Sequence, residues 1–105
     1  MNTSTTKESL SNDPIDKLIF EQGVRIKQVW IDKELDLLAV LLTNRKILKR
    51  SISEFKLLQG ASESDLKEME WDGVSIHWPK LNEDLSLRGL IKYELVGMEL
   101  TGLQK

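Results

Sequence analysis

The sequence has no cysteine, only one histidine and no long apolar run. The lack of cysteine excludes disulfides, a thiolate nucleophile and zinc sites built on thiolates. The single histidine, His77, excludes a metal site with two histidines from one chain. The longest apolar run, Leu37 to Leu42, is far below the roughly 20 residues that a membrane-spanning helix needs. We therefore expect a cytoplasmic chain with no membrane segment and no cofactor.

The composition is that of a single small globular domain. The chain has 105 residues, of which 40% are hydrophobic and 30% charged, which supports one core. Residues 1–12 are rich in Ser, Thr and Asn and lack the apolar segment of a signal peptide, so we expect a disordered tail there.

The charges are divided unevenly along the chain. Residues 24–56 carry eight Lys or Arg against four Asp or Glu, a balance of +4. Residues 61–86 carry two against seven, a balance of -5. Such a division can attract a partner or create complementary oligomer faces, or the two sets can mix on a solvated surface.

An N-terminal helical extension is predicted over residues 13–23. Asp13 suits the N-cap position, Pro14 the first helical position, and Gly23 a left-handed C-terminal residue. The apolar face is narrow and must dock either on its own domain or on a partner. It consists of Ile15, Leu18 and Ile19.

Three strands are predicted next. The first begins at Val24, and its alternation places Trp30 with Val24 and Ile26 on one face. The second, Leu37–Leu42, is apolar at every position, which is typical of a central strand covered on both sides. The third runs from Ile47 to Ile52. Because a domain of this size cannot easily cover both faces of a sheet, a homodimer is a reasonable hypothesis.

The second half alternates short helices with one more strand. Ser53 and Ser62 are predicted helix caps, and Val74–Trp78 is a strand ended by Pro79. Residues 81–85 are expected to be irregular, Ser86 to cap a last helix, and residues 93–105 to form a tail. The result is one α+β domain over residues 24–92. It has a small, mainly antiparallel sheet of about four strands, with helices packed on one face.

No catalytic motif stands out. There is no Gly-x-Ser-x-Gly, phosphate loop or dinucleotide fingerprint. His77 shares a strand face with Ser75 and is expected to bond backbone or a carboxylate of the turn at residues 82–84. We predict no enzymatic activity, and the alternative is a pocket around a perturbed histidine.

Four cations form a candidate nucleic-acid patch near the second hairpin: Arg45, Lys46, Lys49 and Arg50. The acidic pI of about 5.4 argues against it. The other interpretation is a charged hairpin that guards a sheet edge. Of the three tryptophans, Trp30 and Trp78 are expected in the core, while Trp71 is left open between core and interface.

Several segments together resemble the bacterial domain of unknown function 2442 family. They are Arg25–Trp30, Asp36–Leu38, Ser53–Phe55 and Ile76–Ser86. The signature residues, which the resemblance implies to be structural, are Trp30, Ile76, His77, Trp78, Pro79, Leu81, Asp84, Leu85 and Ser86.

The resemblance implies a small α+β protein with no established enzymatic activity. Some members carry a helix-turn-helix, and many look like one half of a two-gene pair similar to toxin–antitoxin modules. Here Asn44-Arg45 replaces the family's Asn-Gly turn, and no helix-turn-helix follows residue 91. We expect a non-enzymatic, antitoxin-like protein-interaction domain whose partner is encoded nearby or is a second copy. The alternative is a nucleic-acid-binding or transcription-associated accessory protein.

Overall fold

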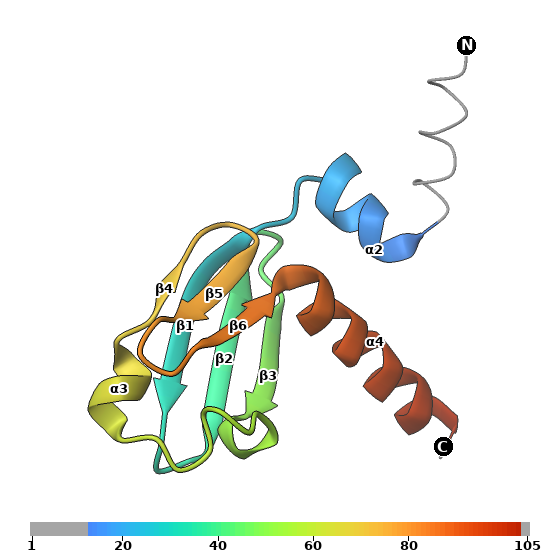
Figure 1. Cartoon of the computed structure of the whole chain (residues 1–105). Helices are drawn as coiled ribbons and strands as arrows, with labels where there is room; N and C mark the ends of the chain where they lie inside the picture. Colours follow the sequence, from blue (N-terminus) through green and yellow to red (C-terminus); the bar gives the residue numbers. More distant parts are fainter. Residues whose placement is uncertain (1–12, 104–105) are drawn as a thin grey trace.

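The computed structural model describes the backbone of residues 13–103 and the side chains of residues 13–95. Two three-stranded antiparallel sheets form the body, and helical segments lie at its ends (Figure 1). The first sheet has the order β1-β2-β3 and the second β4-β5-β6. The strands are β1 (Ile26–Asp32), β2 (Leu37–Leu42), β3 (Ile47–Ser51), β4 (Glu70–Trp71), β5 (Ser75–Trp78) and β6 (Glu83–Ser86). The tail predicted over residues 1–12 lies outside the described residues.

The helical segments are short except for the last. They are α2 (Pro14–Asp16), the π-helix η1 (Lys17–Glu21), the 3-10 helix η2 (Ile52–Glu54), α3 (Glu63–Lys67) and α4 (Leu87–Leu103). Ser62 caps α3 by accepting a hydrogen bond from the Asp65 N–H at 3.1 Å, and Ser86 accepts one from the Gly89 N–H at 3.0 Å. Helix α4 continues to Leu103, so the boundary expected at residue 92 falls within this helix.

The α+β class and the antiparallel pairing are confirmed, but the strands are divided differently from the prediction. About four strands in one sheet were expected, and the described residues form two sheets of three. The additional strands, β4 and β6, are short and largely polar. Residues 81–85 were expected to be irregular, yet Asp84 pairs with His77 and Leu85 with Ile76 across β5 and β6. Pairing rather than composition makes this segment a strand.

A bulge in β1 reverses the expected position of Trp30. Ile26 pairs with Leu42 while Gln28 pairs with Leu41, so one extra residue, Lys27, stands between the two pairs. An extra residue shifts the alternation of side chains from there on. Trp30 is therefore 48% exposed, and its prediction as a core residue is wrong.

The core lies between the two sheets and is closed by the helices. Figure 1 shows the second sheet lying across one face of the first. Leu38 and Val40 of β2 and Ile76 and Trp78 of β5 are fully buried and belong to one apolar cluster. Trp71 is half-buried and packs against this cluster, so of the three tryptophans only Trp30 stands apart from the core.

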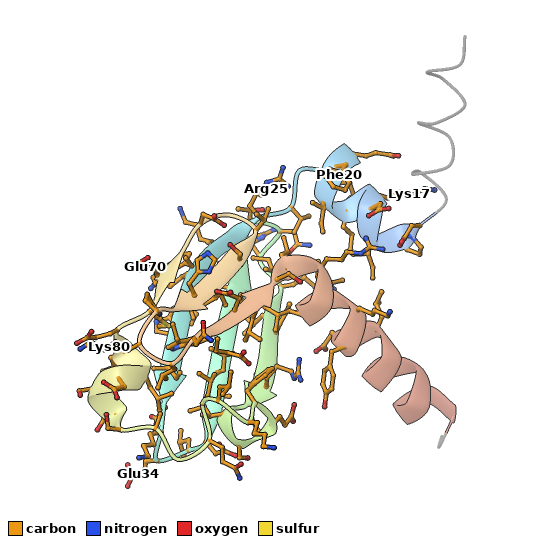
Figure 2. All side chains as sticks on the ribbon, viewed as in Figure 1. Lys17, Phe20, Arg25, Glu34, Glu70 and Lys80 are labelled. Atoms are coloured by element: carbon orange, nitrogen blue, oxygen red, sulfur yellow. The ribbon has the colours of Figure 1, made fainter. Side chains whose placement is uncertain are left out.

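The N-terminal extension docks on its own domain. Asp13 caps α2, and Ile15 and Ile19 are buried in the core. Arg88 at the start of α4 forms ion pairs with Asp13, at 2.7 Å, and with Asp16. Figure 2 shows Arg25 where the extension meets the sheet; its guanidinium donates to the Ile19 carbonyl at 2.7 Å.

We predict that Trp78→Phe destabilises the fold by about 1–3 kcal/mol. The Trp78 side chain is 0% exposed, and its Nε1–H donates to the Leu66 carbonyl of α3 at 2.9 Å. Phenylalanine leaves both a void and an unpaired carbonyl. Denaturant unfolding measures the change, with Trp71→Phe as the matched control, expected to cost less than about 1 kcal/mol. Equal losses for the two variants would contradict this account.

Candidate functional site

A row of three polar side chains crosses the second sheet on the side away from the core. Glu70 of β4 pairs with His77 of β5, and His77 pairs with Asp84 of β6. The His77 Nδ1 lies 2.5 Å from Asp84 Oδ1, and its Nε2 lies 3.2 Å from the Ser75 hydroxyl. Both ring nitrogens therefore have hydrogen-bond partners. The partner of Nδ1 is a carboxylate, one of the two kinds of partner expected from the sequence. Figure 2 shows Glu70 on the outer strand of this sheet.

The surrounding carboxylates favour the charged form of the histidine. The hydrogen bond to Asp84 is the main cause that raises the pKa of His77 above its ordinary value of 6.5. The negative charges of Asp84, Asp72 and Glu70 act in the same direction, while partial desolvation acts against them. The pKa of Asp72 is lowered, chiefly because it accepts the Val74 N–H.

Ser75, His77 and Asp84 are connected in the order of a hydrolase triad, but the details differ from one. The Ser75 hydroxyl also donates to Asp72 Oδ1 at 3.0 Å, so its proton is held by a carboxylate rather than by the histidine. The raised pKa of His77 also means that a larger share of the ring already carries a proton near neutral pH, so less of it is free to accept one from a nucleophile. Neither Ser75 nor His77 lines any of four hollows of the described surface, which have volumes of about 270 to 570 Å³.

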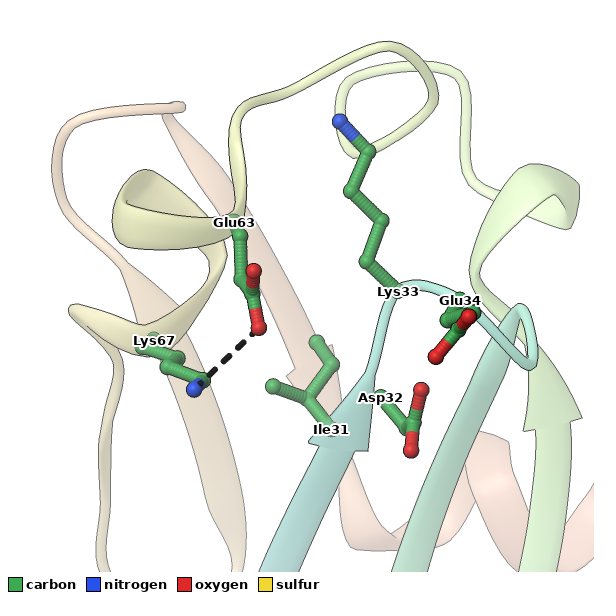
Figure 3. A pocket seen from close by; sticks show the side chains of 6 residues that line it. All are labelled: Ile31, Asp32, Lys33, Glu34, Glu63 and Lys67. Atoms are coloured by element: carbon green, nitrogen blue, oxygen red, sulfur yellow. Dashed lines mark ion pairs between the residues drawn. The ribbon is translucent and has the colours of Figure 1, made fainter.

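The largest of these hollows lies between the β1–β2 loop and α3 and has a volume of about 570 Å³ (Figure 3). Charged side chains line most of it. Glu63 and Lys67 form an ion pair at 3.3 Å, and Figure 3 shows Lys33 extending away from them. Asp32 is already used within its loop, where it accepts the Leu35 N–H at 3.0 Å. The hollow is wide, shallow and solvated.

The described part of the chain holds neither a metal-binding cluster nor a membrane-spanning helix. Among residues 13–95, whose side chains the structure describes, no group of three or more His, Asp or Glu side chains is placed to hold a metal ion. Within residues 13–103, no helix combines the length and the apolar character that crossing a membrane requires.

The predicted basic patch does not lie on one surface: Arg45 and Lys46 belong to the turn before β3, and Lys49 and Arg50 point to opposite faces of β3. Arg45, Lys46 and Lys49 are exposed. Arg50 points the other way: its side chain is 13% exposed and pairs with Glu54 at 2.8 Å. Its guanidinium also stacks on the Tyr93 ring of α4 at 3.4 Å, a cation–π contact that fastens α4 to β3. Three of the four predicted cations are therefore available to a ligand.

The face of the first sheet that points away from the core carries several apolar side chains, and we call it the outer face. By register, three rows cross it: Asp32, Leu37 and Ser51; Trp30, Ala39 and Lys49; and Gln28, Leu41 and Ile47. Trp30 is 48% and Ile47 49% exposed, and Leu41 is half-buried. The sequence indicates this face through the doubly apolar β2, but it hides the contribution of Trp30, because nothing in the residue pattern marks the bulge at Lys27.

The signature residues gather around β5 and β6, with Trp30 as the exception. Ile76 and Trp78 are buried, and Leu81 and Leu85 pack against the core. The others end β5, bond His77 or cap α4. They are Pro79, Asp84 and Ser86.

The fold defines a small α+β domain of two three-stranded antiparallel sheets. The model of a family described as "Protein of unknown function (DUF2442)" matches residues 26–95, and the chain belongs to that family. The N-terminal extension lies outside the match.

Two solved structures share the fold. One is the solution NMR structure of an uncharacterized protein from Chromobacterium violaceum, with 25% identity, a TM-score of 0.59, and coverage of 78% of this chain and 76% of that one. The other is the crystal structure of a protein of unknown function from Rhodospirillum rubrum, with 30% identity, a TM-score of 0.59, and coverage of 66% and 86%. Among curated proteins, no relative matches.

We predict that Asp84→Asn lowers the pKa of His77 toward 6.5, because the variant removes the main cause of its increase. The folded-state pKa is raised, so the stability that His77 contributes is present below pH 6.5 and is lost as the pH rises through the folded-state pKa. An NMR titration of the single histidine ring measures the pKa, and unfolding at several pH values measures the stability. Glu63→Gln, on α3, is the control and should leave the titration unchanged. An unaltered His77 pKa in Asp84→Asn would contradict the assignment.

Proposed function

We propose that this chain is a non-enzymatic protein-interaction domain that associates with a second copy of itself through the outer face. The observation that carries the proposal is the exposure of Trp30 and Ile47 beside an apolar central strand. Contiguous apolar surface on a small domain marks an interaction site more often than scattered apolar residues do. The arrangement at His77 supports the non-enzymatic part, because the Ser75 hydroxyl donates to Asp72 rather than to the histidine.

The arrangement of charges on the outer face favours one way of pairing two copies. Trp30, Ala39 and Lys49 lie in one row across β1, β2 and β3. A two-fold axis parallel to the strands brings β1 of one copy over β3 of the other, so Trp30 meets Lys49 of the second copy twice. The apolar β2 strands then face each other. An axis perpendicular to the strands instead places Lys49 over Lys49, which like-charge repulsion opposes.

The pairing has the properties of a self-complementary interface. In a two-fold dimer each contact occurs twice, so the lysine–indole cation–π contact and the β2 contact both count double. Two sheets that pack face to face keep their strands within about 30° of each other, which agrees with an axis along the strands.

We predict that the full chain is a dimer at micromolar concentration and that Trp30→Ser or Ile47→Ser weakens the dimer at least about tenfold. Analytical ultracentrifugation over a concentration series measures the dissociation constant. The matched control is Leu57→Ser, since Leu57 is also 49% exposed but lies outside the outer face. A chain that stays monomeric at about 1 mM, or a dimer that tolerates both outer-face variants, would overturn the proposal.

The finer form of the proposal is an antitoxin-like role in a two-gene module. It is supported by the resemblance to a family whose members often occur as one half of a gene pair. We predict that the chain co-purifies with the product of the adjacent gene, measured with both proteins co-expressed and only one of them tagged. Absence of a complex in that experiment would remove the antitoxin-like role and leave self-association untouched.

The alternative of nucleic-acid binding is supported by the exposed cations Arg45, Lys46 and Lys49. It is weakened because Arg50, the fourth cation, is occupied by Glu54 and Tyr93. Binding through phosphates would fall steeply with salt, so a mobility shift of mixed-sequence DNA that disappears as salt rises would favour it.

A further inference from the structure

The third strand of the first sheet has an open backbone edge. β3 lies at the end of the order β1-β2-β3, and within the described residues no strand pairs with its other side. The Leu42 N–H donates to the Lys46 carbonyl at 2.9 Å, and the Ile52 N–H donates to the Asp36 carbonyl at 3.3 Å. These two bonds lie at the two ends of β3. They fix which β3 residues direct their backbone groups toward β2.

In an antiparallel ladder, the backbone groups of successive residues point alternately to one side and the other. The backbone groups of Lys46 and Ile52 point toward β2, so the backbone groups of Leu48 and Arg50 do as well. Ile47, Lys49 and Ser51 therefore direct their N–H and C=O groups away from the sheet. Within the described part of the chain, none of these groups takes a backbone hydrogen bond outside the β2–β3 ladder.

An apolar groove runs beside this open edge on the core side of the sheet. It has a volume of about 460 Å³ and lies between β3, the N-terminal extension and α4. Leu48 is buried at its floor, and Ile91 and Leu95 of α4 line it on one side. Leu18 of η1 also lines the groove. The side chain of Leu95 is 36% exposed. Such a groove is wide enough for a large side chain of an added strand.

The charges around the edge specify the ligand further. Lys46 lines the groove near the β2–β3 turn, and Lys49 lies exposed on the outer face of the same strand. Arg50, at the other end of the edge, is already paired with Glu54. The carboxylate of Glu94 on α4 also lines the groove, so acidic ligand residues are favoured only opposite the two lysines.

We infer that the β3 edge binds an extended, acidic segment of a partner protein as an additional strand, with one apolar side chain anchored in the groove. The anchor is opposite Leu48, and acidic residues are opposite Lys46 and Lys49. Main-chain hydrogen bonds to Ile47, Lys49 and Ser51 supply affinity, and the groove supplies specificity. The inference deepens the proposed protein-binding role by naming the partner's chemistry. It uses the backbone edge and the groove, and it shares only Lys49 with the dimer contact of the outer face. The peptide titration and the dimer measurement therefore report on the two proposals separately.

Self-pairing of two β3 edges is disfavoured by the same charges. An antiparallel pair of β3 strands centred on Leu48 or Lys49 brings the lysines and arginines of two copies together. Like charges directly opposite each other on paired strands are destabilising. A partner strand that carries carboxylates replaces this repulsion with attraction.

The test uses a capped peptide whose order follows from the antiparallel register, Thr-Ser-Glu-Leu-Val-Glu. Its Leu is opposite Leu48, and its two Glu residues are opposite Lys49 and Lys46. We expect NMR titration of the full chain to shift the backbone amides of Ile47, Lys49 and Ser51 most. N-methylation of the peptide Val, whose N–H faces β3, should abolish these shifts. N-methylation of the Leu, whose N–H points away, should leave them.

Variants of the chain test the groove and the charge separately. Leu95→Glu should weaken peptide binding at least about tenfold and Lys46→Glu about threefold to tenfold. The matched controls are Leu57→Glu, another exposed leucine, and Lys56→Glu, another exposed lysine, and both should bind as the unchanged chain does. Amide hydrogen exchange of each variant verifies that the fold is retained.

Three results would overturn the inference. One is the absence of shifts at about 2 mM peptide, because a dissociation constant above that concentration is too weak for specific strand addition. Another is equal binding by the two N-methylated peptides, since strand addition requires them to differ. The third is a set of larger, salt-sensitive shifts of the same residues with a DNA duplex, which would assign the edge to phosphates.

Discussion

The structure depends on a central strand that is apolar on both faces. One face of β2, with Leu38 and Val40, builds the core against the second sheet. The other face, with Leu41, belongs to the outer face. A chain of 105 residues has enough material to cover one side of this strand. The uncovered side follows from that shortage, and it carries the surface that we propose for self-association.

The sequence predicted the parts of the fold that local chemistry determines. The helix caps at Asp13, Ser62 and Ser86 are formed by the side chains expected, since a capping oxygen and its N–H lie within a few residues of each other. The prediction that Ser53 caps a helix is wrong: Ser53 lies inside a 3-10 helix, and its hydroxyl donates to Asp36. The central position of β2 also follows from its composition. These features require no knowledge of distant parts of the chain.

Features that depend on pairing could not be predicted in this way. β6 is a strand because His77 and Ile76 pair with Asp84 and Leu85, and its own four residues carry no strand pattern. Trp30 is exposed because the register shifts at Lys27, and Lys27 itself looks like any other polar residue of a strand. The same limit applies to the basic patch. The sequence cannot show that Arg50 faces Tyr93, because alternation along β3 alone does not reveal what lies on either side.

The attachment of the N-terminal extension has a consequence for how relatives could diverge. Leu18, which lines the groove beside β3, belongs to a segment outside the family match, whereas the sheet lies inside it. Arg88 holds this segment through two carboxylates at the surface. Relatives can therefore vary Leu18, and with it one wall of the groove, as long as the buried positions of Ile15 and Ile19 stay apolar. If the edge binds a partner strand as proposed, such a change alters the choice of anchor side chain while the sheets stay the same.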